Sequence, residues 1–227
     1  MNVLIVYAHP EPKSFNGAMK DLASQVLREA GHSVQVSDLY SLGFGAVGGV
    51  NDFTEIADTI FFNYLNEQVR ATNNGGFVLE VKTEMDKVIW ADFLLFQFPL
   101  WWFSFPAIMK GWIDRVFAMG FSYEIRRNFE SGIFRGKRAM LALTTGSPSM
   151  LFRSDGKLGS IEDILHHIHW GMLRYVGMDV LPPFVAFGAA RATPEQRAAY
   201  LEAYKERLRT LETTSAMSLS ALPPSAQ

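Results

Sequence analysis

The fold is decided by residues 94–106, LLFQFPLWWFSFP, where an apolar segment runs into an aromatic loop bounded by prolines. The segment before Pro99 is too uniformly apolar for a half-exposed strand, which predicts a strand buried on both faces, as in a parallel sheet. Pro99 lacks an N–H and is expected to end the pairing. Ser104 and Pro106 are then expected at the N-cap and first position of a helix. Ligands of open α/β sheets bind beyond the carboxyl ends of strands, so the loop is a candidate binding loop, or else a set of core or dimer-interface aromatics.

The composition restricts the classes of protein to consider. The chain has 227 residues, enough for a full hydrophobic core, and its net charge of −2 predicts no nucleic-acid partner. It contains no cysteine, which excludes disulfides and thiolate chemistry and fits a reducing compartment. No apolar run approaches the roughly 20 residues of a membrane span. We therefore expect a cytoplasmic protein with no integral membrane segment.

Strand-like and helix-like segments alternate along the chain. This alternation predicts an α/β protein, with one doubly wound five-stranded parallel sheet and helices on both faces, in a single domain over residues 1–212. Residues 43–80 are expected to leave the repeat, carrying a short helix near residues 52–66, and residues 213–227 are expected to be a disordered tail. The predicted strands cover residues 2–8, 33–37, 93–98, 138–143 and 178–187, and the later helices residues 83–91, 106–119, 161–176 and 194–211.

Two loops at predicted strand ends carry polar groups suited to a ligand. Residues 9–16 precede a helix whose N–H groups favour phosphate, and Ser14 and Asn16 add neutral donors. Thr144-Thr145-Gly146 offers hydroxyls and close backbone approach to the polar edge of a ring. Ser14 could instead only cap its helix, and the second loop could be an ordinary turn. No GxGxxG motif follows the first strand, which argues against an ordinary dinucleotide-binding fingerprint.

Several motifs in a fixed order make the pattern recognisable. They are Val6-Tyr7-Ala8-His9-Pro10, Ser14-Phe15-Asn16 with Ala18-Met19-Lys20, Ser37-Asp38-Leu39-Tyr40, Phe96 to Phe103, Pro106 to Trp112, and Thr144-Thr145-Gly146. Over residues 2–211 the chain resembles the NAD(P)H:quinone oxidoreductases of flavodoxin-like fold, with a strong match to the FAD-binding DT-diaphorase branch. The resemblance implies a homodimeric flavoenzyme that transfers a hydride from NAD(P)H through flavin N5 to a quinone, by a two-electron ping-pong mechanism.

The resemblance also implies roles for individual residues. Arg197 lies where the family uses an arginine near the adenosine of FAD, although it could be a solvated residue on a helix surface. The other implied cofactor-binding residues are His9, Ser14, Phe15, Asn16 and Ala18 for the phosphates and ribityl chain, Asn63 from across the dimer, Pro99, Leu100, Trp101, Trp102 and Phe103 along the ring, and Thr144, Thr145 and Gly146 at its pyrimidine side. The implied substrate pocket comprises Trp102, Phe103, Tyr123, Ile125, Phe152 and Tyr175.

The chain departs from the family at the expected proton relay. The Tyr and His of the vertebrate branch have no counterpart in residues 150–158, and Phe152 cannot exchange a proton. No catalytic residue is therefore certain: the proton relay would have to be dispensable, supplied by solvent, or replaced by Lys157 or Asp155. His166-His167 and His169 could share a helix face with a metal, but no fourth ligand is evident, so we predict no metal.

Two other functions remain open at this stage. The same fold could hold FMN and reduce azo or nitro compounds. Alternatively, the chain could be a flavin-bearing regulatory subunit of a membrane transporter, which an exposed apolar patch distinct from a dimer interface would favour.

Overall fold

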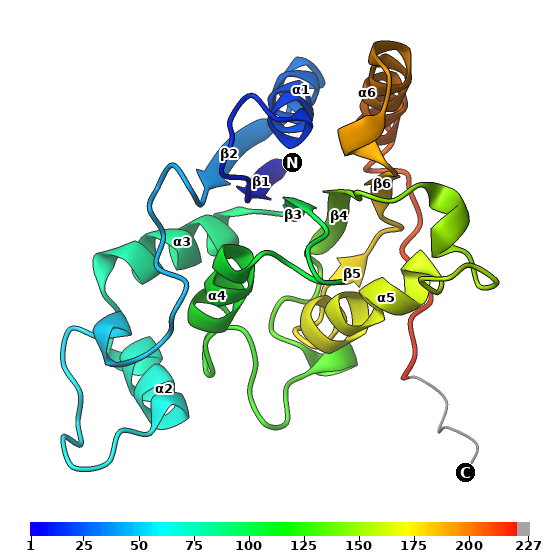
Figure 1. The fold of residues 1–227 in the computed structure, drawn as a ribbon. Helices are drawn as coiled ribbons and strands as arrows, with labels where there is room; N and C mark the ends of the chain where they lie inside the picture. Colours follow the sequence, from blue (N-terminus) through cyan, green and yellow to red (C-terminus); the bar gives the residue numbers. More distant parts are fainter. Residues whose placement is uncertain (222–227) are drawn as a thin grey trace, which may run out of the picture.

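The computed structural model describes residues 1–221, and a parallel sheet with helices on both faces lies at its centre (Figure 1). The strand order is β2-β1-β3-β4-β5, and β6 also pairs with β4. This confirms the predicted doubly wound sheet, with its fifth position shared by two short strands. The strands are β1 (Asn2–Tyr7), β2 (Ser33–Asp38), β3 (Phe93–Pro99), β4 (Arg138–Thr144), β5 (Asp179–Val180) and β6 (Phe184–Ala186).

The helices alternate with the strands, as the sequence predicts. The α-helices are α1 (Phe15–Glu29), α2 (Tyr64–Asn74), α3 (Leu79–Trp90), α4 (Ala107–Val116), α5 (Ile161–Ile168) and α6 (Pro194–Arg209). The short helices are η1 (Val50–Asp52), η2 (Phe129–Ser131), η3 (Ser149–Phe152), η4 (His169–Arg174) and η5 (Ala189–Arg191). Helices α1 and α6 cover one face of the sheet, and α3, α4 and α5 cover the other (Figure 1).

Strand β3 is the central strand, and every one of its residues is buried. It pairs with β1 on one side and with β4 on the other, so that Tyr7, Gln97 and Ala142 lie side by side. The pairing extends through Pro99, which lies opposite Thr144, because the next N–H, that of Leu100, donates to the Thr144 carbonyl at 2.8 Å. The prediction that Pro99 ends the pairing is therefore wrong by one residue.

Successive side chains of the strands point into two separate cores. Leu94, Phe96 and Phe98 pack with α3, α4 and α5, whereas Phe93 and Leu95 pack with α1 and α6. A strand covered on both faces must be apolar at odd and even positions alike, which is the pattern read from the sequence.

The helix expected near residues 52–66 is displaced. Residues 53–63 form no helix, and α2 begins at Tyr64, where the Asn63 side chain accepts from the Asn66 N–H. Glu67 of α2 accepts from the Ala57 N–H at 2.9 Å and pairs with Arg70 at 2.8 Å, so the irregular segment is held by hydrogen bonds to the helix that follows it. Local composition did not reveal the contact between Ala57 and Glu67, because the two residues are ten apart in sequence.

Three further boundaries differ from the sequence prediction. The helix from Ile161 changes at His169 to a π-helical turn, in which the Tyr175 N–H donates to the Trp170 carbonyl. The last predicted strand divides at Pro182-Pro183 into β5 and β6. The predicted tail begins with ordered contacts, since the Met217 N–H donates to the Val180 carbonyl at 2.8 Å, which corrects the boundary at 213. Residues 222–227 lie outside the described residues.

A buried ion pair ties residues 43–80 to α4. The Arg115 guanidinium donates to Asp52 at 2.7 Å and to the Gly45 carbonyl at 2.7 Å, and it pairs with Glu80 at 2.6 Å. The Tyr64 hydroxyl donates to the second Asp52 oxygen at 2.5 Å. The Arg115 and Asp52 side chains are only 5% and 1% exposed, so loss of either partner leaves an uncompensated charge away from water.

We expect Asp52→Ala to lower the free energy of unfolding by about 3 kcal/mol, because it strands the Arg115 charge. Urea unfolding monitored by tryptophan fluorescence measures the change. The control is Asp86→Ala, which removes an exposed pair with Lys82 and is expected to cost less than about 0.5 kcal/mol. Equal costs for the two variants would contradict the assignment.

Candidate active site

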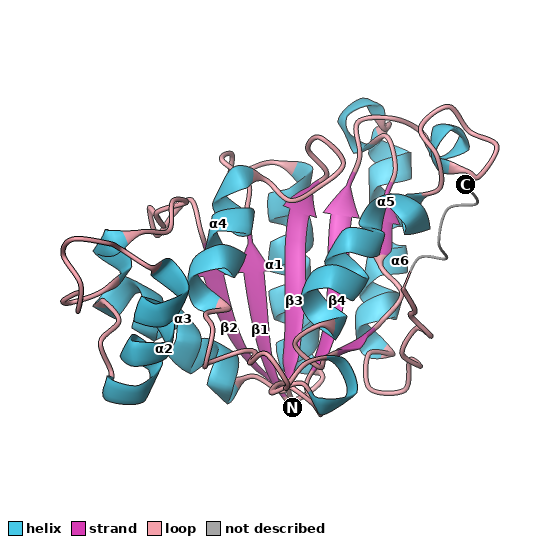
Figure 2. Ribbon diagram, turned by 90° about the horizontal axis from the view of Figure 1, so that it is seen from below, coloured by secondary structure: helices cyan, strands magenta, loops and turns pink. Residues whose placement is uncertain are grey.

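The carboxyl ends of β1, β3 and β4 open into a cavity of about 510 Å³. Figure 2 shows these parallel strands ending at one edge of the sheet, beneath the connecting loops. The cavity brings together eleven residues that the sequence singles out, namely His9, Ser14, Phe15, Asn16, Pro99, Leu100, Trp101, Thr144, Thr145, Gly146 and Arg197. Lys13, Ala189 and Ala190 complete its lining.

The loop after β1 is folded tightly over the start of α1. Ser14 is the N-cap, and its side chain accepts from the Gly17 N–H at 3.1 Å. A Cβ at Gly17 would lie 1.9 Å from the Pro12 carbonyl oxygen, so only glycine permits this approach. Ser14 therefore caps α1 and also lines the cavity, so the two roles considered for it do not exclude each other. The loop leaves the positive end of the α1 dipole at the cavity, beside Lys13.

Asn16 forms the floor of the cavity. Its amide nitrogen donates to the Thr144 hydroxyl at 2.8 Å, and the residue is 3% exposed. Its amide oxygen is buried and has no hydrogen-bond partner among residues 1–221. A buried acceptor without a partner costs free energy unless a ligand or water donates to it. Asn16 therefore brings to the lining of the cavity a buried acceptor whose hydrogen bond the described residues do not complete.

The turn after β4 is held by one of its own hydroxyls. The Thr145 hydroxyl donates to the Ser147 carbonyl at 2.7 Å and accepts from the Gly188 N–H at 3.2 Å. This ties the turn to the loop after β6, whose residues Ala189 and Ala190 the sequence reasoning missed. The signal that could have found them is their position, since they follow a parallel strand at the same edge of the sheet. A Cβ at Gly146 would meet no atom within 4 Å, so the space beside this glycine is open.

The aromatic loop after β3 is held in an unusual conformation. Trp102 and Phe103 both have positive φ, 49° and 59°, which costs free energy for bulky residues. Backbone hydrogen bonds between Trp101 and Ser104 close the turn. Trp101 lines the cavity, whereas Trp102 is 96% exposed and Phe103 is also exposed.

Ser104 does not cap α4, which corrects the sequence prediction. The N-cap position is Pro106, and no side chain caps the helix there. The Ser104 hydroxyl lies 3.0 Å from Nε2 of His167, while Nδ1 of that ring lies 2.9 Å from the Ile164 carbonyl. The aromatic loop is thereby connected to α5.

The residues expected in a substrate pocket lie apart in the single chain. Tyr123 and Tyr175 have ring centroids 5.6 Å apart and line a second cavity, of about 620 Å³, with α2 and α4. Ile125 is 79% exposed, and Phe152 is buried against Phe187. Asn63 caps α2, and Ala18 is exposed on α1; neither lines the first cavity.

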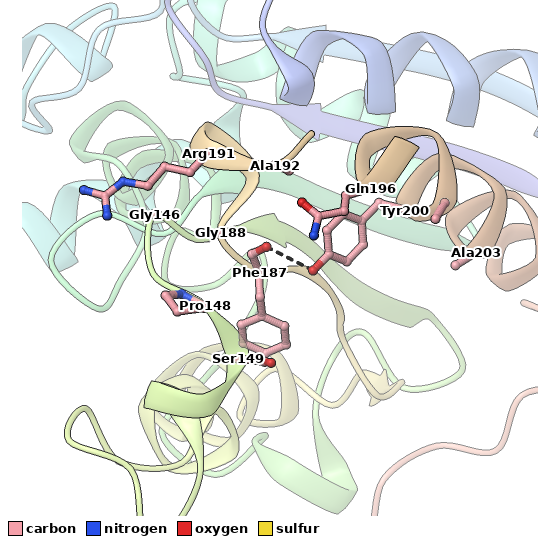
Figure 3. Close-up of a pocket in the computed structure, with 11 residues that line it drawn as sticks. Gly146, Pro148, Ser149, Phe187, Gly188, Arg191, Ala192, Gln196, Tyr200 and Ala203 are labelled. Carbon is pink, nitrogen blue, oxygen red and sulfur yellow. Dashed lines mark hydrogen bonds between the residues drawn. The ribbon is translucent and has the colours of Figure 1, made fainter. Parts of the chain in front are cut away.

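A third cavity, of about 640 Å³, adjoins the first at Gly146 (Figure 3). It lies between α6, η3 and the loop after β6, and the Tyr200 hydroxyl donates to the Phe187 carbonyl at 3.0 Å along its wall. Its small side chains, Ala192, Ala199 and Ala203, come from α6 and the residue before its N-cap.

The three histidines of α5 and η4 take separate environments. His167 faces Ser104, the His166 ring stacks beside Trp170, and His169 is 3% exposed. Among residues 1–221 no three His, Asp or Glu side chains are grouped so that they could hold a metal ion. Within the same residues, none of the helices combines the length and the apolar character that a membrane crossing requires.

The fold and the loops at its carboxyl edge define the class of the protein. The family model described as flavodoxin-like fold matches residues 1–211, and the chain belongs to this family. It is an oxidoreductase, and the resemblance to NAD(P)H:quinone oxidoreductases is confirmed by its relatives.

Two curated relatives carry enzyme names. The chain is 40% identical over 210 residues to ribosyldihydronicotinamide dehydrogenase [quinone] of Mus musculus, covering 92% of this chain and 91% of the relative. It is 38% identical over 209 residues to NAD(P)H dehydrogenase [quinone] 1 of Rattus norvegicus, covering 92% and 76%. A solved structure from Klebsiella pneumoniae, provisionally named a quinone reductase, is 43% identical with a TM-score of 0.91, covering 95% and 86%.

We expect the buried His169 to make the protein less stable in acid. Burial, with smaller contributions from His166 and His167, lowers the pKa of His169 to about 4. Between that value and the ordinary pKa of about 6.5 the unfolded chain binds more protons, so stability falls as the pH decreases through this window. The contribution of His169 to the free energy of unfolding should fall by roughly 2 kcal/mol from pH 7 to pH 5.

Urea unfolding at the two pH values tests this expectation. The variant His169→Leu should lose most of the pH difference, whereas His167→Ala, which changes an exposed ring, should retain it. The same pH difference in His169→Leu as in the wild type would contradict the assignment.

Proposed function

We propose that this chain is a FAD-dependent NAD(P)H:quinone oxidoreductase that works in the cytoplasm by a two-electron ping-pong mechanism. The observation that carries the proposal is the first cavity, where the unpartnered Asn16 oxygen lies beside the N-terminus of α1 and the Thr144-Thr145-Gly146 turn. The names of the relatives at about 40% identity support a quinone as the electron acceptor.

The residues of the cavity fit a flavin. The Asn16 oxygen would accept from a hydroxyl of the ribityl chain, and the first turn of α1 with Ser14 would hold a phosphate. The open backbone at Gly146 would approach the polar edge of the ring. A bound flavin supplies hydride transfer between NAD(P)H and the acceptor; the protein orients it, excludes water and fixes donors beside it.

Two cations, Lys13 and Arg197, line the cavity, and the Arg197 guanidinium lies 3.5 Å from the Ala190 carbonyl oxygen. We propose FAD rather than FMN because each of these cations would hold one phosphate of its pyrophosphate.

The exposed apolar side chains support a homodimer. Trp102 and Ile60 are each 96% exposed, Ile125 is 79% exposed and Phe61 is 70% exposed, which is unusual for large apolar residues. We propose that they meet a second copy. In the dimer Asn63, Tyr123 and Tyr175 would then belong to the flavin site of the partner copy, which accounts for their distance from the first cavity.

The identity of the bound flavin and the electron acceptor that is reduced distinguish this proposal from two other functions. An FMN-dependent azo or nitro reductase would retain FMN and prefer those acceptors. A regulatory subunit of a membrane transporter would bind flavin without turning over quinone.

Identification of the bound cofactor tests the proposal. Flavin is released by heat from the purified protein and identified by chromatography, and NAD(P)H oxidation is recorded with and without a quinone. FAD with quinone-dependent oxidation is expected. Absence of flavin after reconstitution would refute the proposal, and FMN with azo or nitro reduction would favour the first alternative.

We expect Trp102→Ala to weaken flavin binding about 10-fold, because in the proposed dimer Trp102 would form an aromatic wall beside the ring. Its side chain covers almost nothing in the single chain, so the free energy of unfolding of the flavin-free protein should change by less than about 0.5 kcal/mol. Flavin fluorescence titration and urea unfolding measure the two effects. The control Ile89→Ala, also exposed, should alter neither.

We propose that Lys157 donates a proton in place of the family's missing relay. We therefore expect Lys157→Ala to reduce turnover most at high pH. Lys157 is exposed on the loop after η3, and solvent protons become scarcer as the pH rises. The pH dependence of kcat measures the effect. A profile identical to that of the wild type would exclude Lys157 as the proton source.

A further inference from the structure

Four polar side chains form a hydrogen-bonded chain beneath the first cavity. The Tyr204 hydroxyl of α6 donates to the Gln97 amide oxygen at 3.2 Å. The Gln97 amide nitrogen donates to the main-chain carbonyl of Asn16 at 2.5 Å, and Asn16 donates to Thr144 at 2.8 Å. The four residues are 0%, 0%, 3% and 6% exposed, in that order. The chain therefore connects α6, β3, α1 and β4 through buried residues and reaches the lining of the cavity at Asn16 and Thr144.

The direction of the hydrogen bonds is fixed by one carbonyl. The main-chain oxygen of Asn16 can only accept, so the Gln97 nitrogen must face it. The Gln97 oxygen must then face Tyr204, which donates. Burial raises the pKa of Tyr204, so its hydroxyl stays protonated and able to donate.

Gln97 is unusual in its surroundings. It is the one polar side chain of β3, among apolar residues that are all buried. A buried amide is costly unless its polar atoms are paired, and here both its oxygen and its nitrogen have partners. The pairing ends at Asn16, whose own amide oxygen faces no protein donor.

We propose that Gln97 and Tyr204 are positioning residues for the ligand, acting through Asn16. They hold the first turn of α1 against β3, which orients the Asn16 amide toward the hydroxyl-bearing chain of the ligand rather than toward its ring. The inference rests on the proposed flavin function and adds that the body of α6, distant from the ring, sets the affinity for the ribityl part.

The test compares two flavins that differ in that part. Riboflavin carries the ribityl hydroxyls, whereas lumiflavin has a methyl group in their place. Binding of each to the full-length, flavin-free protein is followed by quenching of flavin fluorescence. Tyr204→Phe removes one hydroxyl and keeps the ring, so its riboflavin Kd should rise about 5-fold and its lumiflavin Kd less than about 2-fold.

Two further variants separate positioning from general loosening. Tyr200→Phe removes a hydroxyl from the same helix, bonded to the Phe187 carbonyl, and should leave the ratio of the two Kd values unchanged. Gln97→Met keeps the length of the side chain and removes both of its hydrogen bonds, so it should change the ratio in the same direction as Tyr204→Phe. It provides the measurement if Tyr204→Phe fails to fold.

The outcomes are distinguishable. A selective loss of riboflavin affinity supports the positioning role. Equal weakening of both flavins, or no change in either, would overturn it while leaving the proposed function intact, because the wild type would still bind flavin. A wild type that binds neither flavin would overturn both.

Discussion

The candidate site depends on strand β3 being covered on both faces and paired along both edges. Because β1 and β4 are parallel neighbours of β3, their carboxyl ends meet its end at one edge of the sheet. Each connecting loop then opens toward the same space. Because β3 is apolar at odd and even positions alike, its apolar pattern alone does not fix the register. A displacement by one residue would turn Gln97 to the other face and break its hydrogen bonds to Tyr204 and Asn16, so this buried amide favours the register that places it beside Tyr7 and Ala142.

Buried polar groups serve two different purposes in this fold. Asp52 and Arg115 are paired with each other and also with Tyr64, Glu80 and the Gly45 carbonyl, so they hold an irregular segment against α4. In the hydrogen-bonded chain from Tyr204 through Gln97 to Asn16, only the amide oxygen of Asn16 lacks a partner among the described residues. A fully paired network stabilises the folded chain, whereas a buried acceptor without a partner costs free energy until water or a ligand donates to it.

The aromatic loop, in contrast to these buried polar groups, exposes large apolar side chains to solvent. Trp102 and Phe103 adopt positive φ in an exposed turn, where the single chain offers them little packing. Strained backbone and exposed aromatic rings are both unfavourable in isolation, and they occur together at functional sites when an additional molecule covers them. The hydrogen bond between Ser104 and His167 holds this loop in place from the side of α5.

The sequence by itself determined the alternation of strands and helices and the two-sided burial of β3, because these depend on local periodicity. It also indicated the loops at the strand ends, whereas several of the cavity residues, such as His9 and Arg197, came from the resemblance to NAD(P)H:quinone oxidoreductases. Only the tertiary structure decided that α2 begins at Tyr64, that Ser104 bonds to His167 instead of capping α4, and that Gln97 connects Tyr204 to Asn16. The last two outcomes depend on hydrogen bonds between residues that are distant in sequence, and such pairings leave no periodic signal in the chain.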